Sequence, residues 1–173
     1  MSQLAMPQPA LPPQMLSPDV SAPTPEAPTP QIPNPQAIMQ QRMKLLGSIL
    51  HLMMHSPLHR MYPISALEER IIPSLLHNQF RYYEMNGTPI GFVNWAWLSD
   101  KLESQYCTGQ YELALDEWVG GSHLWFPEFM APFDHTAAIV RDLRKNVFKK
   151  GTPAKALRIS ATGEVKGVSK YRL

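Results

Sequence analysis

A serine and a histidine stand three residues apart in the stretch "HSPLHRMYP", which runs from His55 to Pro63. The residue before a proline is pushed out of helical geometry, so Ser56 and Pro57 should end the apolar helical pattern that precedes them. His59 then follows a helix end on irregular backbone, where its imidazole can be aimed at a reacting group. Because a histidine can take up and return a proton near neutral pH, His59 is a candidate general base.

Glu128, in the stretch "WFPEFMAPF", is a candidate partner for this histidine. A histidine that gains a proton needs a group that fixes its tautomer and stabilises its charge, and a carboxylate is the usual one. Glu128 lies in an aromatic and apolar strand pattern, where an unpaired charge would be costly. It should therefore either meet a partner or point to solvent, since strand side chains alternate between faces.

A metal site is the alternative chemistry that the histidines suggest. His51 and His55 stand four residues apart on one helix, a spacing that metal ligands use. The residues between them are Leu, Met and Met, so the glutamate of an H-E-x-x-H motif is missing, and no third ligand is evident. Cys107 is the only cysteine, which excludes an internal disulfide and a multi-cysteine metal site. We therefore expect no metal.

The elements that must position these residues begin with helices. Apolar residues at helical spacing predict a long amphipathic helix over residues 36–55. In "ISALEERIIPSLLHNQ", Ser65 and Glu68 have the spacing of a capping box, and Pro73 should kink or interrupt that second helix. A helix broken near Thr108 and Gly109, followed by an acidic helical turn, is expected over residues 100–118.

Strand patterns alternate with these helices. The stretches "QFRYYEM" and "PIGFVNWAWLS" flank Asn86-Gly87, a strong hairpin signal, and "HLWFPEFM" resembles one strand with a bulge or edge at Pro127. Asp134 should cap a helix over "DHTAAIVRDLRKNVF", and residues 154–172 should form a terminal hairpin. The whole pattern predicts an α+β fold with a mostly antiparallel sheet flanked by helices.

Composition divides the chain at residue 35. Eleven of its 18 prolines fall within residues 1–35, with only two charged residues among them, which predicts a disordered, Pro-rich leader before a domain over residues 36–173. No signal peptide or membrane span is evident, so we expect a soluble, cytoplasmic protein.

Charge is unevenly distributed. Residues 141–173 hold ten Lys or Arg against two acidic residues, whereas residues 36–140 hold six against ten. A basic end favours an acidic partner, which could be nucleic acid, anionic lipid or an acidic carrier protein, although a solvated surface that serves solubility is an equal alternative.

Several motifs in order resemble those of the toxin-activating lysine acyltransferases that accompany RTX toxins. They are "SPLHR", then Trp95-Ala96 with Leu98-Ser99, then Trp118, Gly121, Trp125-Phe126 and Ala131-Pro132-Phe133. Each motif alone is weak, but their joint order and spacing over residues 45–168 are specific. The resemblance implies a GCN5-related acyltransferase-like fold and transfer of a fatty acyl group from acyl carrier protein to an internal lysine of a partner toxin.

The resemblance also implies which residues are catalytic. The histidine of its S-P-L-H motif falls on His59 and the serine on Ser56, while the family's aspartate after the W-F pair falls on Glu128, a carboxylate that is one methylene longer. No permanently bound cofactor and no nucleic-acid partner are implied, and self-association as a homodimer is left open. At the place where GCN5-related enzymes bind pyrophosphate on a glycine-rich loop, this chain has "PFDHTAAI" with Asp134, which favours a carrier protein over coenzyme A.

Two other functions stay open on the sequence. One is a coenzyme A-dependent transferase of small acyl groups to amines, and the other is a catalytically silent binding module or chaperone for a secreted partner. Direct transfer is preferred over an acyl-enzyme on Ser56 or His59, which is not excluded.

Overall fold

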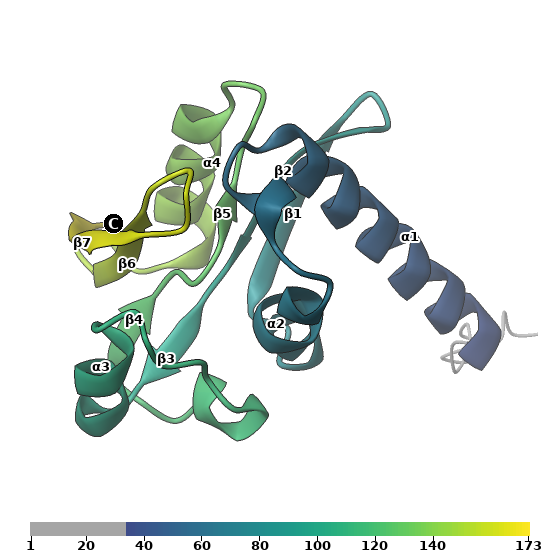
Figure 1. Ribbon diagram of the computed structural model, residues 1–173. Helices are drawn as coiled ribbons and strands as arrows, with labels where there is room; N and C mark the ends of the chain where they lie inside the picture. Colours follow the sequence, from purple (N-terminus) through teal and green to yellow (C-terminus); the bar gives the residue numbers. More distant parts are fainter. Residues whose placement is uncertain (1–33) are drawn as a thin grey trace, which may run out of the picture. The chain divides into compact units, whose positions relative to one another are not determined.

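The computed structural model of the protein describes residues 34–173 and has the expected α+β fold (Figure 1). Helices and mostly antiparallel strands alternate along the chain, which confirms the fold class. The GCN5-related resemblance stays a prediction. The leader predicted for residues 1–35 falls, except for Asn34 and Pro35, outside the described residues. No helix in the described part of the chain is both long and apolar enough to cross a membrane.

The first helix, α1 (Pro35–His55), confirms the predicted amphipathic helix. A proline suits its first position because the N–H that proline lacks would have no partner inside the helix there. Ile49, Leu52 and Met53 are its buried residues, and they pack in a cluster with Phe92 and other apolar side chains. The helix ends at His55, directly before Ser56-Pro57, as the proline rule predicts.

The second helical segment differs from its predicted form. Its first two residues, Ser65 and Ala66, are α-helical, and they lead into a π-helix, η2 (Leu67–Ile71), and then the α-helix α2 (Ile72–Leu76). The helical register therefore changes one residue before Pro73. This agrees with the predicted interruption at the proline. Ser65 itself has helical backbone, so its predicted role as the cap in a capping box with Glu68 is wrong.

The predicted Asn86-Gly87 hairpin is confirmed. It joins β1 (Phe80–Met85) to β2 (Thr88–Asn94) in an antiparallel pair. Asn86 and Gly87 have φ values of 52° and 76°. A two-residue hairpin turn of type I′ requires two successive residues in the left-handed region, and Asn-Gly adopts this conformation at low cost.

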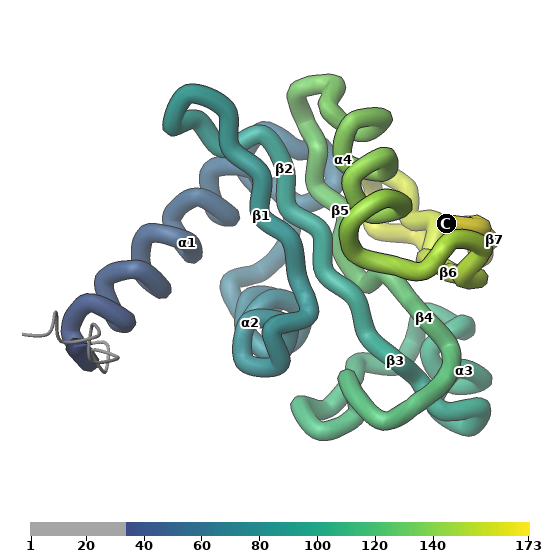
Figure 2. The backbone as a smooth tube through the Cα atoms, turned by 180° about the vertical axis from the view of Figure 1, so that it is seen from behind, coloured from purple at the N-terminus to yellow at the C-terminus, as the bar shows by residue number. Residues whose placement is uncertain are grey.

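Two stretches that resemble single strands, "PIGFVNWAWLS" and "HLWFPEFM", are each divided between two sheets (Figure 2). The first gives β2 and then β3 (Ala96–Leu98), and the second gives β4 (His123–Trp125) and then β5 (Phe129–Met130). One sheet has the order β1-β2-β5, and the other begins β3-β4. The prediction of single strands is therefore wrong, and Pro127 contributes to the break because it cannot donate to a strand ladder.

The second sheet is completed by the terminal hairpin, which confirms that prediction. Its strands are β6 (Pro153–Ile159) and β7 (Val165–Arg172), and the full order is β3-β4-β6-β7. Only the β4–β6 pair is parallel among the strand pairs of residues 34–173. The sheets are thus mostly antiparallel, as expected.

Helices follow both β3 and β5. The interrupted helix predicted after β3 is confirmed as α3 (Asp100–Tyr106) and the 3-10 helix η3 (Leu115–Trp118). After β5 come α4 (Thr136–Asp142) and a π-helix, η4 (Leu143–Val147). The residue before α4 is His135, so the predicted cap at Asp134 is wrong. Asp134 has a φ of 62°, and aspartate is one of the few residues that tolerate this left-handed turn geometry.

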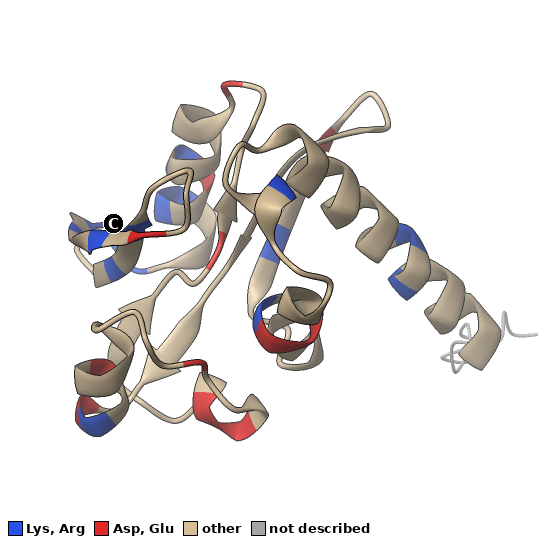
Figure 3. Cartoon of the chain, viewed as in Figure 1, with Lys and Arg blue, Asp and Glu red and all other residues tan. Residues whose placement is uncertain are grey.

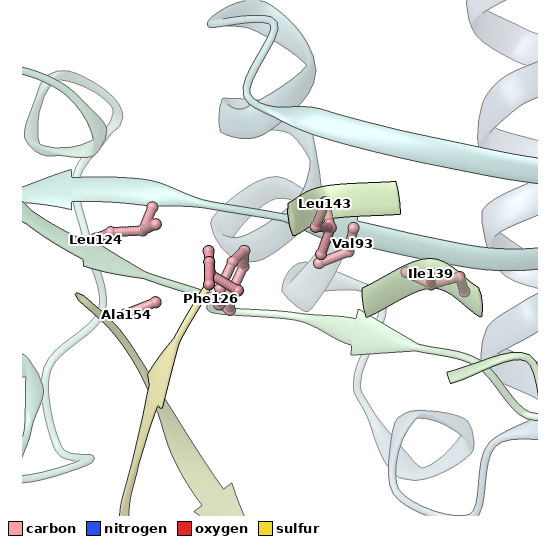
Figure 4. Close-up of a cluster of buried hydrophobic side chains, with 7 residues drawn as sticks. Val93, Leu124, Phe126, Ile139, Leu143 and Ala154 are labelled. Atoms are coloured by element: carbon pink, nitrogen blue, oxygen red, sulfur yellow. The ribbon is translucent and has the colours of Figure 1, made fainter. Parts of the chain in front are cut away.

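The core between the two sheets is a cluster of buried apolar side chains (Figure 4). It draws on β2, β4, β6, α4 and η4, so it joins elements of both sheets at the point where their strands separate. Its members include Val93, Leu124, Phe126, Ile139, Leu143 and Ala154. Burial of such side chains fixes the helical segment of α4 and η4 against the strands.

Gly121 packs against the backbone of β3, and substitution there should destabilise the fold. A Cβ at this position would lie 1.9 Å from the carbonyl carbon of Leu98. Gly121 N–H also donates to Trp97 O at 2.9 Å, which holds the two segments together. We expect Gly121→Ala to lower the free energy of unfolding, measured by urea denaturation, by about 3 kcal/mol.

The matched control is Gly47→Ala in α1, where no atom lies within 4 Å of the added Cβ. It should raise the free energy of unfolding by about 0.5–1 kcal/mol, because alanine favours the helix. Equal stability of Gly121→Ala and the wild type would show that β3 does not need this close approach.

Candidate active site

The structure brings Ser56, His59 and Glu128 together. His59 opens a 3-10 helix (His59–Met61) shortly after α1 ends, and its side chain is 7% exposed. Its Nδ1 lies 2.5 Å from Ser56 Oγ, and its Nε2 lies 3.0 Å from Glu128 Oε2. Of the two alternatives for Glu128, the structure shows the paired one, since this residue is buried and meets a partner.

Glu128 is held from its backbone by Asn94, the last residue of β2. Glu128 N–H donates to Asn94 Oδ1 at 2.8 Å, and Asn94 N–H donates to Glu128 O at 3.1 Å. The Asn94 amide also donates to the carbonyl of Arg70 at 2.7 Å. Asn94 is fully buried, so these bonds fix the segment that carries Glu128. Sequence reasoning missed Asn94, although an asparagine inside the apolar run "GFVNWAW" was a usable signal.

Arg70 fixes the carboxylate of Glu128 from the other side. Its Nη1 donates to Glu128 Oε1 at 3.3 Å, and its Nη2 pairs with Glu112. Because Arg70 takes Oε1, the second oxygen of Glu128 is left to His59. Burial disfavours the charged form of Arg70, but the negative charges of Glu128 and Glu112 outweigh the effect of burial. Together they hold the pKa of Arg70 above its usual value. No sequence signal points to this role, since an arginine in an amphipathic helix is usually a surface residue.

Tyr62 covers this charged group. The Arg70 guanidinium lies 5.5 Å from the centre of the Tyr62 ring, and the His59 ring lies 5.3 Å from it. Burial, helped by the negative charge of Glu128, raises the pKa of Tyr62. Its hydroxyl therefore stays protonated at neutral pH and adds no second anion beside Glu128.

A cavity of about 350 Å³ opens on the catalytic candidates. His59, Tyr62 and Glu128 line it, and most of its remaining walls are apolar, with Phe126 and Leu143 among them. Ser56 is not among the residues that line it. The cavity can hold an apolar group with its reactive end beside His59, and we call it the catalytic cavity.

The hydrogen bonds around His59 suit a proton carrier. A serine hydroxyl can donate to Nδ1 or accept from it, so Ser56 supports both tautomers of the ring. Because a carboxylate only accepts, neutral His59 donates Nε2–H to Glu128, and the lone pair that can take a proton is on Nδ1, which faces Ser56 Oγ. The resulting imidazolium has an acceptor for each N–H, which are Ser56 Oγ and the Glu128 carboxylate.

The two other histidines of this region do not join the site. His55 Nδ1 lies 2.8 Å from the backbone oxygen of His51, and the His55 ring lies 5.2 Å from the ring of Phe133. Within residues 34–173, no group of three or more His, Cys, Asp or Glu is placed to hold a metal ion.

Comparison with known proteins assigns the family. Residues 38–172 match the model of the RTX toxin acyltransferase family. The chain belongs to this family. The resemblance found in the sequence motifs is thereby confirmed, and the protein is an acyltransferase.

Named members of the RTX toxin acyltransferase family are similar over most of the domain. The chain is 39% identical over 111 residues to the lysine-acyltransferase RtxC of Vibrio cholerae, which covers 64% of this chain and 72% of that protein. It is 31% identical to the RTX-I toxin-activating lysine-acyltransferase ApxIC of Actinobacillus pleuropneumoniae, over 74% and 73% of the two chains. It is 30% identical to the protein-lysine myristoyltransferase HlyC of Escherichia coli, over 60% of this chain and 59% of that protein.

Arg70 is expected to act as a positioning residue for Glu128. Arg70→Met should lower kcat for acyl transfer by about tenfold to a hundredfold with little change in KM, because Glu128 loses the partner on Oε1. Arg70→Lys should restore part of the loss, since it returns the charge without the planar fork. The measurement is a steady-state acyl-transfer assay over a range of donor concentrations.

The control for this prediction is Arg42→Met, which removes an exposed arginine of α1 and should leave both constants unchanged. If Arg70→Met raised KM alone, or if Arg70→Lys were as inactive as Arg70→Met, Arg70 would not position Glu128 through its charge.

Proposed function

We propose that this acyltransferase moves a fatty acyl group from acyl carrier protein to the ε-amine of internal lysines in an RTX-type toxin, and thereby activates that toxin. The observation that carries the proposal is the imidazole of His59, held between Ser56 and Glu128 at the wall of an apolar cavity. The names of the relatives support lysine as the acceptor and a toxin as the partner. The cytoplasmic location and the homodimer remain predictions.

The acceptor amine explains the need for a base. A lysine ε-ammonium has an ordinary pKa near 10.4, so it must lose a proton before its nitrogen can attack a thioester. His59 Nδ1 accepts this proton through the Ser56 hydroxyl, and Glu128, which accepts from Nε2–H, stabilises the imidazolium that results. The amine nitrogen then bonds to the acyl carbon and the C–S bond breaks. The proton on His59 passes to the departing thiolate, and the second proton of the amine nitrogen leaves to solvent as the amide forms. This is a direct transfer, in which Ser56 passes on a proton and forms no acyl-enzyme.

The donor is the second part of the proposal. A carrier protein is acidic, and the basic segment of residues 141–173 suits such a partner. The segment "PFDHTAAI" also lacks the glycines that a pyrophosphate-binding loop needs, and its Asp134 would repel a pyrophosphate. Both features favour acyl carrier protein over coenzyme A.

Intact-mass analysis of an RTX toxin incubated with this protein tests the proposal. The donors are myristoyl-acyl carrier protein, myristoyl-coenzyme A and acetyl-coenzyme A, each with a control that lacks the enzyme. A myristoyl increment on a lysine, found with the carrier protein as donor, supports the proposal. An acetyl increment would identify the small-acyl transferase instead, and no increment from any donor would indicate a silent binding module.

A further inference from the structure

A second cavity, of about 770 Å³, adjoins the site and is lined by basic side chains. Figure 3 shows basic residues gathered on α4 and on the hairpin of β6 and β7. Five of the residues that line this basic cavity are cations, contributed by α4, η4, the loop after it and β7: Arg141, Arg144, Lys145, Lys150 and Arg172. None of the side chains that line it is acidic.

These five cations lack carboxylate partners in the part of the chain that the structure describes. The Arg144 guanidinium donates to the backbone carbonyl of Arg172 at 3.2 Å, which orients it without neutralising it. Like charges at such a density repel one another, and an anion bound among them relieves that repulsion. Arginine also binds phosphate through two parallel hydrogen bonds. The cavity therefore suits a phosphate group.

The basic cavity borders the catalytic cavity. Val140, Arg144 and Leu173 line both of them. A ligand with an anionic group at one end and a reactive acyl group at the other can therefore span the two. The acceptor lysine does not fit this description, because it is a cation and five cations would repel it.

Another cavity is better suited to the acceptor. It has a volume of about 210 Å³, is lined by Glu69 and Glu112 as well as Arg70, and shares Tyr62 and Leu157 with the catalytic cavity. The two substrates thus have separate approaches of different charge. The basic approach is left for the donor.

We propose that the basic cavity binds the phosphate of the phosphopantetheine arm that carries the acyl thioester. This inference rests on the proposed function, since it assigns a site to the donor of that reaction. The same arm is present in acyl carrier protein and in coenzyme A, so the cavity would recognise what the two donors share. The arm would then reach past Val140 to place its thioester beside His59.

Titration of the full chain with 4′-phosphopantetheine and with pantetheine tests the site without any turnover. We expect the phosphorylated compound to bind at least about tenfold more tightly to the wild type, as judged by calorimetry. The variant Arg141→Gln/Lys145→Gln/Arg172→Gln should bind both compounds equally. Arg42→Gln/Lys44→Gln in α1 is the matched control and should keep the tenfold preference. Equal binding of the two compounds by the wild type would overturn the proposal.

Transfer assays separate this proposal from the proposed function. The Arg141→Gln/Lys145→Gln/Arg172→Gln variant should have a lower kcat/KM than the wild type with myristoyl-acyl carrier protein and with myristoyl-coenzyme A. Its kcat/KM with a myristoyl thioester of N-acetylcysteamine, which has no phosphate, should be unchanged. An equal loss with all three donors would overturn the phosphate site. If the wild type used none of the donors yet still preferred 4′-phosphopantetheine, the proposed function would fail and the site would stand. Comparison of the wild-type kcat/KM for myristoyl-acyl carrier protein and for myristoyl-coenzyme A identifies the natural source of the phosphopantetheine arm.

Discussion

His59→Ala should lower kcat for acyl transfer by about 10²–10⁴-fold, the usual contribution of general acid–base catalysis. The loss is expected because no other group in the catalytic cavity has two polar partners that stabilise it after it accepts a proton. KM for the donor should change little, since the apolar walls of the cavity remain. The measurement is the rate of acylated product, followed by intact mass at saturating donor.

Two further variants make this prediction specific. His55→Ala removes a histidine at the end of α1 that does not line the catalytic cavity, and it should keep wild-type activity. Because His59 is buried, His59→Asn serves as a second, polar replacement, and the folding of each variant is checked by circular dichroism and urea denaturation. An active and folded His59→Ala protein would remove His59 from the mechanism.

The hairpin and the first helix could be predicted because their causes are local. Asn86-Gly87 adopts its turn through its own backbone preferences, and Pro57 ends α1 through contact with its immediate neighbour. Such preferences act over a few residues, so they can be recognised in the printed sequence. The same holds for Ser56 and His59, which are three residues apart.

The division of the strands could not be predicted because its cause is tertiary. β2 and β3 are separated by Trp95 alone, yet they pair with different strands and belong to different sheets. An alternating pattern gives the same signal whether a strand keeps one partner or changes partners partway. The left-handed turn at Asp134 escaped prediction for a related reason, because aspartate is equally common as a helix cap.

The supporting residues of the site were missed for the same reason. Glu128 lies 69 residues from His59 in sequence, and the motif resemblance rather than spacing linked the two. Arg70 and Asn94 act on Glu128 from a π-helix and a strand end, and neither belongs to the motifs that carried the resemblance. π-Helical turns are often found at functional sites, but no sequence rule locates them.

Ser56 acquires a different role once its position is known. A serine beside a histidine suggests a nucleophile and its base, as in hydrolases. Here the hydroxyl lies 2.5 Å from Nδ1 and does not line the catalytic cavity, so we expect it to exchange a proton with the ring rather than to attack the thioester. The geometry therefore favours His59 as the base for the acceptor amine, with Ser56 as the hydroxyl through which Nδ1 takes up the proton.

Glu128→Gln should lower kcat by about 10³-fold, because the amide keeps the shape of the side chain but not its charge. Neutral His59 can still donate to the amide oxygen, whereas the imidazolium that forms during the reaction loses its anionic partner. Arg70 keeps Glu112 as a partner, so the fold should remain. The measurement is again kcat at saturating donor, with urea denaturation to compare stability.

Glu128→Asp gives the second half of this test. The 3.0 Å contact between His59 Nε2 and the carboxylate would open, because aspartate is one methylene shorter and Asn94 fixes the backbone of residue 128. We expect an intermediate activity, above Glu128→Gln because the charge is kept, and below the wild type because the hydrogen bond is lost. Glu84→Gln, an exposed carboxylate of β1, should have no effect. Wild-type activity of Glu128→Gln beside a less active Glu128→Asp would show that the length of this side chain matters and its charge does not.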